Sequence, residues 1–162
     1  MIGTALLTLL ALTGQTTPSQ DARQTTFAIQ VALDRAGFST GVIDGRMGSN
    51  TRRAIDAYRQ RHSAEPSPFP DPLLEYRITA EDEAGPFVSE IPTDLVEQSK
   101  LPALAYRSVV EALAERFHTT PEVLQELNAS ASFTAGNNIR VPNVEPLVVL
   151  TTPAPAKADS NG

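Results

Sequence analysis

The 162-residue chain is expected to be mainly α with small β elements, and three observations lead to this expectation. Apolar residues recur every three or four positions in four short stretches, as they do on the buried face of a helix. Shorter stretches in which apolar and polar residues alternate indicate a few half-buried strands. Thirteen prolines and polar ends leave much of the length to linkers and tails, which favours two small domains over one large core.

The charge and composition exclude several classes of function. The formal net charge of -6 argues against a protein that binds nucleic acid through its phosphates. The chain has no cysteine, which excludes a disulfide, a thiolate metal site and a cysteine nucleophile. Its two histidines, His62 and His118, lie in different segments and are too few for a catalytic zinc site unless carboxylates complete it. We therefore expect no metal and no cofactor.

Residues 1–14 are a candidate secretory signal segment. They are apolar and too short to span a bilayer as a mature helix, although the basic residues that usually precede such a segment are missing. Residues 15–24 are polar and are expected to form a flexible spacer. These features predict a protein of the periplasm or cell envelope, or a secreted one, without a stable membrane span.

Residues 25–88 are expected to form a first domain that begins with two short helices. Helical periodicity predicts one helix over residues 27–36, with Gly37 as its C-terminal cap, and another over residues 51–61. The apolar residues at helical spacing that would form the buried faces are Ile29, Leu33 and Ala36 in the first helix and Ala54, Ile55 and Tyr58 in the second.

The loop between these helices carries candidate ligand contacts. Asp44 and Gly45 form a strong turn pair, and Gly48 offers another position of free backbone geometry three residues later. One of residues 49–51 is expected to be the N-cap of the second helix. Exposed amides in such a loop can bind a polar ligand, although most glycine-rich turns are only connectors. A binding role predicts a shallow polar groove, open to solvent, beside residues 44–51.

An ordered set of residues in this region gives a first resemblance to a known family: Gln30, Leu33, Gly37, Phe38, Gly41, Asp44, Gly45, Gly48, Thr51, Ala54 and Tyr58. With this spacing, residues 25–61 resemble the small helical peptidoglycan-binding domain of bacterial wall hydrolases and L,D-transpeptidases. The chain departs from the family at Arg59, where a glutamine is usual, and no third helix is visible downstream. The ligand contacts that the resemblance implies are Asp44, Gly45, Gly48 and Thr51, with Arg52 as a contact to a carboxylate. The alternative for Arg52 is an ion pair with Asp56 on a solvated helix face.

The rest of the first domain is expected to contain a hairpin. The alternation of apolar and polar residues over positions 74–78 predicts a strand. Residues 81–85 would form a hydrated acidic turn, and residues 86–88 would return as the partner strand in place of the family's third helix. The three consecutive acidic residues are then surface charges and not a catalytic pair of carboxylates held at a fixed distance. Residues 89–105 follow as a linker.

The second half of the chain is expected to form another small domain. A capping box at Ser108 begins a helix that ends near His118, whose ring we interpret as a charge at the helix end and not as a ligand. Thr120 caps a second helix, which ends at Asn128. Residues 139–142 are expected to form a short strand that a proline terminates.

A second ordered set of residues lies in this half: Ala112, Leu113, Ala114, Phe117, Thr119, Pro121, Leu124, Leu127, Asn128, Gly136, Ile139, Val141, Pro142 and Asn143. With this spacing, residues 106–144 resemble the LysM module, a βααβ carbohydrate binder. The opening strand usual in that module is replaced by residues 104–108. The ligand contacts that we expect near the last turn are Asn128, Asn138 and Ile139.

Together the resemblances imply a small helical peptidoglycan-binding-like domain plus a βααβ LysM-like domain, an order similar to the N-terminal region of certain bacterial L,D-transpeptidases. Those enzymes use a cysteine nucleophile, which this chain lacks, and residues 145–162 are expected to be a disordered polar tail. We therefore predict a non-catalytic protein that binds or targets peptidoglycan, or the truncated N-terminal part of such an enzyme, with a separate catalytic partner. Two weak sites on one chain would reinforce each other on a polymer.

The part of peptidoglycan that is bound stays open at this stage, as do two alternative functions. The bound part of peptidoglycan is either the glycan strand or the stem peptide. One alternative function is a protein-interaction module of the cell envelope. Another, less favoured, is a wall hydrolase that uses carboxylates alone, which would need an acidic residue with a raised pKa in a pocket.

Overall fold

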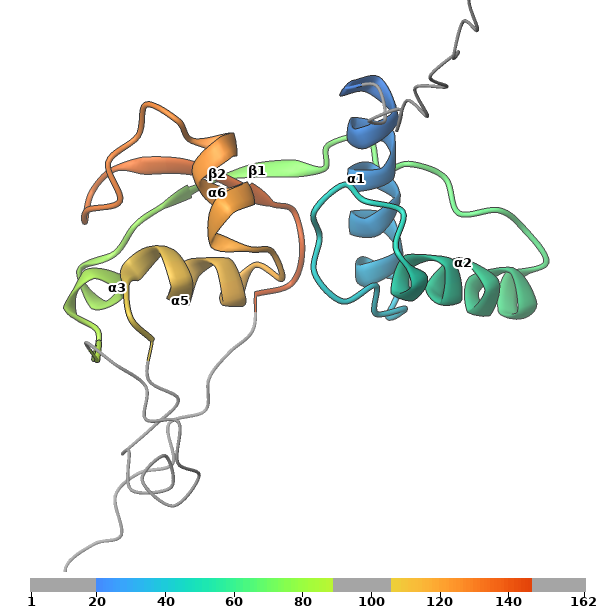
Figure 1. Ribbon diagram of the computed structural model, residues 1–162, viewed down its shortest axis with the longest axis horizontal. Coiled ribbons are helices and arrows are strands. Elements are labelled where there is room, and N and C mark those ends of the chain that lie inside the picture. Colours follow the sequence, from blue (N-terminus) through green and yellow to red (C-terminus); the bar gives the residue numbers. More distant parts are fainter. Residues whose placement is uncertain (1–19, 89–105, 147–162) are drawn as a thin grey trace, which may run out of the picture.

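Figure 1 shows the fold of the chain in a computed structural model, which describes residues 20–88 and 106–146. Within these residues the protein is mainly helical, with five helices and a two-stranded antiparallel sheet, so the expected class is confirmed at this level. None of the described helices is both long enough and apolar enough to cross a membrane. The candidate signal segment, the first half of the spacer, the linker and most of the tail lie outside the described residues.

Helix α1 (Gln20–Arg35) begins earlier than its periodicity predicts and buries a broader face. Its first turn carries Asp21, whose charge is favourable at a helix N-terminus, and residues 20–24 are helical where a spacer is expected. Its buried residues are Ala28, Gln30, Val31 and Leu33. Ala36, predicted to be buried, is exposed. The buried face is broad because α1 contacts α2 and also contributes to a core shared with the second half of the chain.

Helix α2 (Ser49–His62) has Gly48 as its N-cap, and no side chain bonds the amides of its first turn. The prediction that one of residues 49–51 is the cap is therefore wrong. Thr51 is only 2% exposed, because its hydroxyl turns inward and accepts a hydrogen bond from Gln30 Nε2 at 3.2 Å. The N-terminus of α2 is left uncapped beside the preceding loop.

The sheet pairs strands that are far apart in the chain. Strand β1 (Leu73–Arg77) runs antiparallel to β2 (Asn138–Pro142). The expected hairpin with residues 86–88 is wrong, because Phe87 forms only an isolated parallel bridge, to Tyr106. The alternation in β1 does predict a strand, but it does not select a partner, and β2 offers the matching apolar face.

The acidic segment after β1 forms a short helix. Helix α3 (Ala80–Ala84) begins with a capping box in which Thr79 Oγ1 accepts a bond from Asp82 N at 3.1 Å and Asp82 Oδ2 accepts one from Thr79 N at 2.9 Å. The prediction of a hydrated turn at residues 81–85 is wrong, since these reciprocal bonds begin a helix. Asp82 is buried, with only 7% of its surface exposed.

Helices α5 (Val109–Arg116) and α6 (Pro121–Leu127) begin at the predicted caps. In both, a hydroxyl accepts a bond from the backbone three residues on: Ser108 Oγ from Glu111 N at 3.2 Å, and Thr120 Oγ1 from Val123 N at 3.3 Å. Pro121 occupies the first turn of α6, where its missing N–H costs no hydrogen bond.

One hydrophobic cluster joins both halves of the described chain. Its buried members are Val31, Ile43, Ile78, Leu113, Ala114, Phe117, Leu124, Ile139, Val141 and Val144. Among the hydrogen bonds that cross the same boundary are those from Ile43 N to His118 O and from Thr119 Oγ1 to Ile43 O, each at 2.7 Å. Figure 1 shows α1 between α2 on one side and the sheet with α5 and α6 on the other. The two halves therefore pack against each other as one body.

Candidate functional site

The side chain of Gln30 organises the loop between α1 and α2. Gln30 is 1% exposed, and its Oε1 accepts bonds from Asp44 N at 3.1 Å and Gly45 N at 2.7 Å. Its Nε2 lies 3.2 Å from each of three oxygens, on Asp44, Arg46 and Thr51. A single buried amide thus satisfies the polar groups on the inner side of the loop, and the opposite side remains free to face solvent.

A shallow groove of about 260 Å³, open to solvent and lined mostly by polar residues, lies beside this loop. Its lining residues come from α1, the loop and the first turn of α2: Gln30, Thr40, Val42, Asp44, Arg46, Gly48, Ser49, Asn50 and Thr51. Most of these residues are exposed, and the uncapped N-terminus of α2 forms one wall. A groove therefore lies beside residues 44–51, but the surface that it exposes is more apolar than expected.

The loop residues named from the sequence differ in their burial and in their position relative to this groove. Asp44 is half-buried, and its Oδ1 accepts a bond from Arg46 N at 2.8 Å. Gly45 is buried at φ +73°, and a Cβ there would lie 2.7 Å from Arg23 Cγ in α1. Gly48 is exposed, with nothing within 4 Å of the position of a Cβ. Asp44, Gly45 and Thr51 therefore support the groove, whereas Gly48 lies on its open surface.

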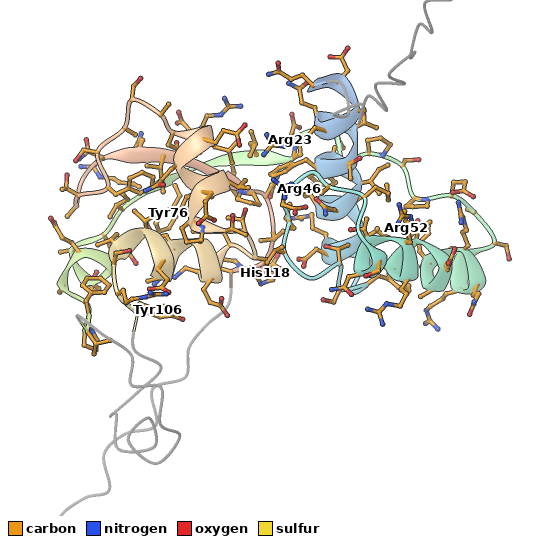
Figure 2. The ribbon with its side chains drawn as sticks, in the orientation of Figure 1. Arg23, Arg46, Arg52, Tyr76, Tyr106 and His118 are labelled. Carbon is orange, nitrogen blue, oxygen red and sulfur yellow. The ribbon has the colours of Figure 1, made fainter. Side chains whose placement is uncertain are left out.

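Arg52 is exposed, and its guanidinium makes no hydrogen bond or ion pair with the residues that the structure describes. The alternative pairing with Asp56 is wrong, because Asp56 Oδ1 accepts a bond from Arg59 Nη1 at 2.9 Å instead. Arg59 also contacts Glu65, with Nε 2.7 Å from Oε1. Figure 2 shows Arg46 in the loop and Arg52 on α2, and of the two only Arg46 lines the groove.

The residues named in the second half do not join this groove. Asn128 is buried, and its side chain ties α6 to β2, because Nδ2 donates to Leu124 O and Arg140 O at 2.8 Å and Oδ1 accepts from Arg140 N at 2.7 Å. Ile139 is 1% exposed and belongs to the core. Asn138 is exposed at the start of β2. Of these three side chains, only that of Asn138 faces solvent.

A buried polar cluster beneath α3 was not anticipated from the sequence. Asp82 accepts hydrogen bonds from Tyr76 Oη, at 2.6 Å, and from Arg116, which also donates to Tyr76 Oη at 2.9 Å. Burial raises the pKa of Asp82, but these bonds and those from Thr79 lower it by more, so its pKa lies below the ordinary value. Burial, followed by the bond to Asp82, raises the pKa of Tyr76. Each of these three side chains has a partner within the cluster, so the cluster stabilises the packing of β1, α3 and α5.

His118 lies at the boundary between the two halves and does not merely end a helix (Figure 2). It adopts a left-handed backbone conformation, with φ +56°. Its Nδ1 lies 2.9 Å from Asp34 Oδ2 of α1, and its buried Nε2 has no partner among the described residues. In residues 20–88 and 106–146, no three His, Cys, Asp or Glu side chains gather as a metal site would require.

A larger cleft of about 580 Å³ separates α1 from α6. It is lined by Gln20, Arg23, Gln24, Phe27, Pro70, Asp71, Pro72, Leu73, Val123, Glu126, Leu127 and Arg140. None of the ligand contacts expected from the sequence lines this cleft. It arises only when α1 packs against the second half, so no local motif could have indicated it.

Comparison with known proteins adds no family. A scan against models of protein families finds no match to this chain, and a search of curated proteins finds none that is significantly similar. Function must therefore be inferred from the groove, the cleft and the motifs of the sequence.

Proposed function

We propose that this chain is a non-catalytic protein of the cell envelope that binds peptidoglycan through the groove beside residues 44–51. The observation that carries the proposal is the groove itself, an open concavity lined mostly by polar residues at the loop whose motif resembles a peptidoglycan-binding domain. The proposed location is the periplasm or cell envelope, or outside the cell. A catalytic partner on a separate chain would act on the wall that this protein holds.

The chemistry of the groove suits a polar ligand. Helix α2 presents the unbonded amides of its first turn, and these donors and the helix dipole favour an oxygen-rich or anionic group. Arg52 follows the lining residue Thr51 on α2, and its exposed guanidinium, which has no partner among the described residues, has a planar fork that matches a carboxylate. Val42, which is 50% exposed, offers an apolar contact in the same groove.

The second half supports the proposal through its order of elements. Apart from the intervening helix α3, strand β1 of the first half is followed by helices α5 and α6 and strand β2, in the order β, α, α, β, and the two strands are paired. We infer a LysM-like unit whose opening strand is β1, supplied by the segment before α3, with α3 and the chain up to residue 108 inserted between β1 and α5. Residues 104–108 would then be part of this insertion.

A pulldown on purified sacculi tests the groove. Gly48→Trp would fill the groove without backbone strain, because Gly48 is extended at φ -80° with free space around a Cβ. We expect the wild-type protein to be retained and this variant to be retained about threefold less or worse. Gly48→Ser is the matched control, because it adds a capping hydroxyl of little bulk and should be retained like the wild type. The proposed function is wrong if the wild-type protein stays in solution. The groove is not the binding site if Gly48→Trp is retained like the wild type.

A second candidate is a protein-interaction module of the envelope. The observation in its favour is that the groove loop exposes two large apolar side chains, with Val42 50% and Met47 38% exposed. Exposed apolar residues around one loop are typical of a contact with a protein. Absence of sacculus binding, together with a protein partner that Met47→Asp releases, would favour this function.

A further inference from the structure

The cleft between α1 and α6 combines an apolar lining with charges. Half-buried Phe27 of α1 and Leu73 of β1 line it together with Leu127 of α6. Its volume of about 580 Å³ falls in the range of sites that bind small organic molecules. The cleft is formed by both halves of the chain, which pack around one core, so its walls are fixed by the fold.

Two of the four charges that line the cleft neutralise each other. Arg23 binds Glu126 with two parallel hydrogen bonds, Nη1 to Oε1 at 2.6 Å and Nη2 to Oε2 at 2.7 Å. Figure 2 shows Arg23 on the side of α1 that faces the second half of the chain. This fork joins α1 to α6 across the cleft and leaves neither group free for a ligand.

The other two charges have no partner in residues 20–88 and 106–146. The carboxylate of Asp71 and the guanidinium of Arg140 are exposed and form no hydrogen bond or ion pair with any described residue, including each other. Glu75 lies opposite Arg140 in the sheet register but makes no ion pair with it. The cleft therefore presents one unpaired anion and one unpaired cation beside apolar side chains.

We propose that this cleft binds a short peptide that carries both a carboxylate and an ammonium group. Arg140 would hold the carboxylate through its planar fork, Asp71 would attract the ammonium group, and Phe27 would contact the aliphatic part of the ligand. The inference builds on the proposed function and names the part of the wall that is bound here, a stem peptide with a diamino acid, which has both charges.

Other ligand classes fit the cleft less well. A neutral glycan would leave the charges of Asp71 and Arg140 unpaired, so they would add nothing to its affinity. A simple anion such as phosphate would meet Arg140 but would be repelled by Asp71. A zwitterion satisfies both groups at once, and charge complementarity of this kind gives specificity.

Calorimetric titration of the full chain with a synthetic stem tripeptide ending in meso-diaminopimelate tests the site. We expect saturable binding, with Arg140→Gln and Asp71→Asn each weakening it by about tenfold. Arg77→Gln is the matched control, because Arg77 is also exposed on the sheet but does not line the cleft. The same tripeptide with amidated carboxylates and an acetylated amine should bind no better than the Arg140→Gln variant binds the free one.

The outcomes separate this site from the groove. If Arg140→Gln and Arg77→Gln weaken tripeptide binding equally, the cleft is not the site. The same conclusion follows if the capped peptide binds as tightly as the free one. A wild-type protein that is retained on sacculi but ignores the tripeptide also overturns it, while the groove proposal stands. A Gly48→Trp variant that loses sacculi yet binds the tripeptide normally supports two independent sites.

Discussion

The amide of Gln30 determines the shape of the groove loop, since it bonds the loop on both its donor and its acceptor side. Gln30→Leu keeps the volume but leaves the part-buried N–H of Asp44 and the buried N–H of Gly45 unpaired. At about 1–3 kcal/mol for each unsatisfied group, we expect the free energy of unfolding to fall by about 3 kcal/mol in a urea titration. Gln60→Leu, the same change at an exposed position of α2, should alter it by less than about 0.5 kcal/mol. Equal effects of the two substitutions would contradict the assigned role of Gln30.

The glycines of the groove loop give a second prediction, because two of them differ in what surrounds them. At Gly45, φ is +73° and a Cβ would lie 2.8 Å from the backbone oxygen of Arg23, so Gly45→Ala should lower the free energy of unfolding by about 2–4 kcal/mol. At Gly48 the same substitution meets open space and should change it by less than about 1 kcal/mol. Thermal melts of the two variants would compare them directly. A stable Gly45→Ala protein would mean that the loop does not pack under α1.

Helix α3 is held in place by Asp82, so the stability that this residue contributes should depend on pH. Bonds from Tyr76, Thr79 and Arg116 outweigh burial and keep the pKa of Asp82 below its ordinary value. A carboxyl group with a lowered folded-state pKa contributes stability above its unfolded pKa of about 4, and this contribution is lost as the pH falls through the lower folded pKa. Asp82→Asn should therefore cost much more stability at pH 6 than at pH 2.5, as measured by urea unfolding.

Glu81→Gln is the control for this pH dependence, because Glu81 is exposed on the same helix. Its effect on the free energy of unfolding should be small at both pH values. If Asp82→Asn costs the same stability at pH 6 and pH 2.5, then the cluster of Tyr76, Asp82 and Arg116 does not hold an ionised carboxylate, and α3 is anchored in another way.

The elements also show which features a sequence can predict. The caps at Ser108 and Thr120 are local, since the bonded amide lies three residues on, and both helix starts were correct. The partner of β1 is not local, and alternation in a strand fits any apolar face. The acidic residues after β1 were misjudged because the bond between Thr79 and Asp82 that begins a helix is easily missed within a run of charges.

The candidate site also combines local features that the sequence predicts with contacts between distant residues that it does not. Turn residues around Gly45 predict a tight loop, and the groove lies beside it. The role of Gln30 was missed because the side chains that it bonds, on Asp44 and Thr51, lie 14 and 21 residues away. The cleft was missed for a stronger reason, since Asp71 and Arg140 come together only through packing of the two halves.

At the scale of the whole molecule, the shared core predicts that the two halves unfold together. Ile43 belongs to the first half, is fully buried, and lies in one cluster with Phe117 and Val141 of the second. Ile43→Ala should lower the free energy of unfolding by about 2–5 kcal/mol, in a single cooperative transition. Amide hydrogen exchange in β2 should accelerate as much as exchange in α2, because both require the same global opening.

Val42→Ala serves as the control for this change, because Val42 is the neighbouring residue and is 50% exposed. It should leave the exchange rates of both strands and helices nearly unchanged. If Ile43→Ala instead accelerates exchange in α2 while β2 keeps its protection, the halves unfold independently. The cleft between α1 and α6 would then open without unfolding either half, and its two unpaired charges would no longer be held at a fixed separation for a ligand.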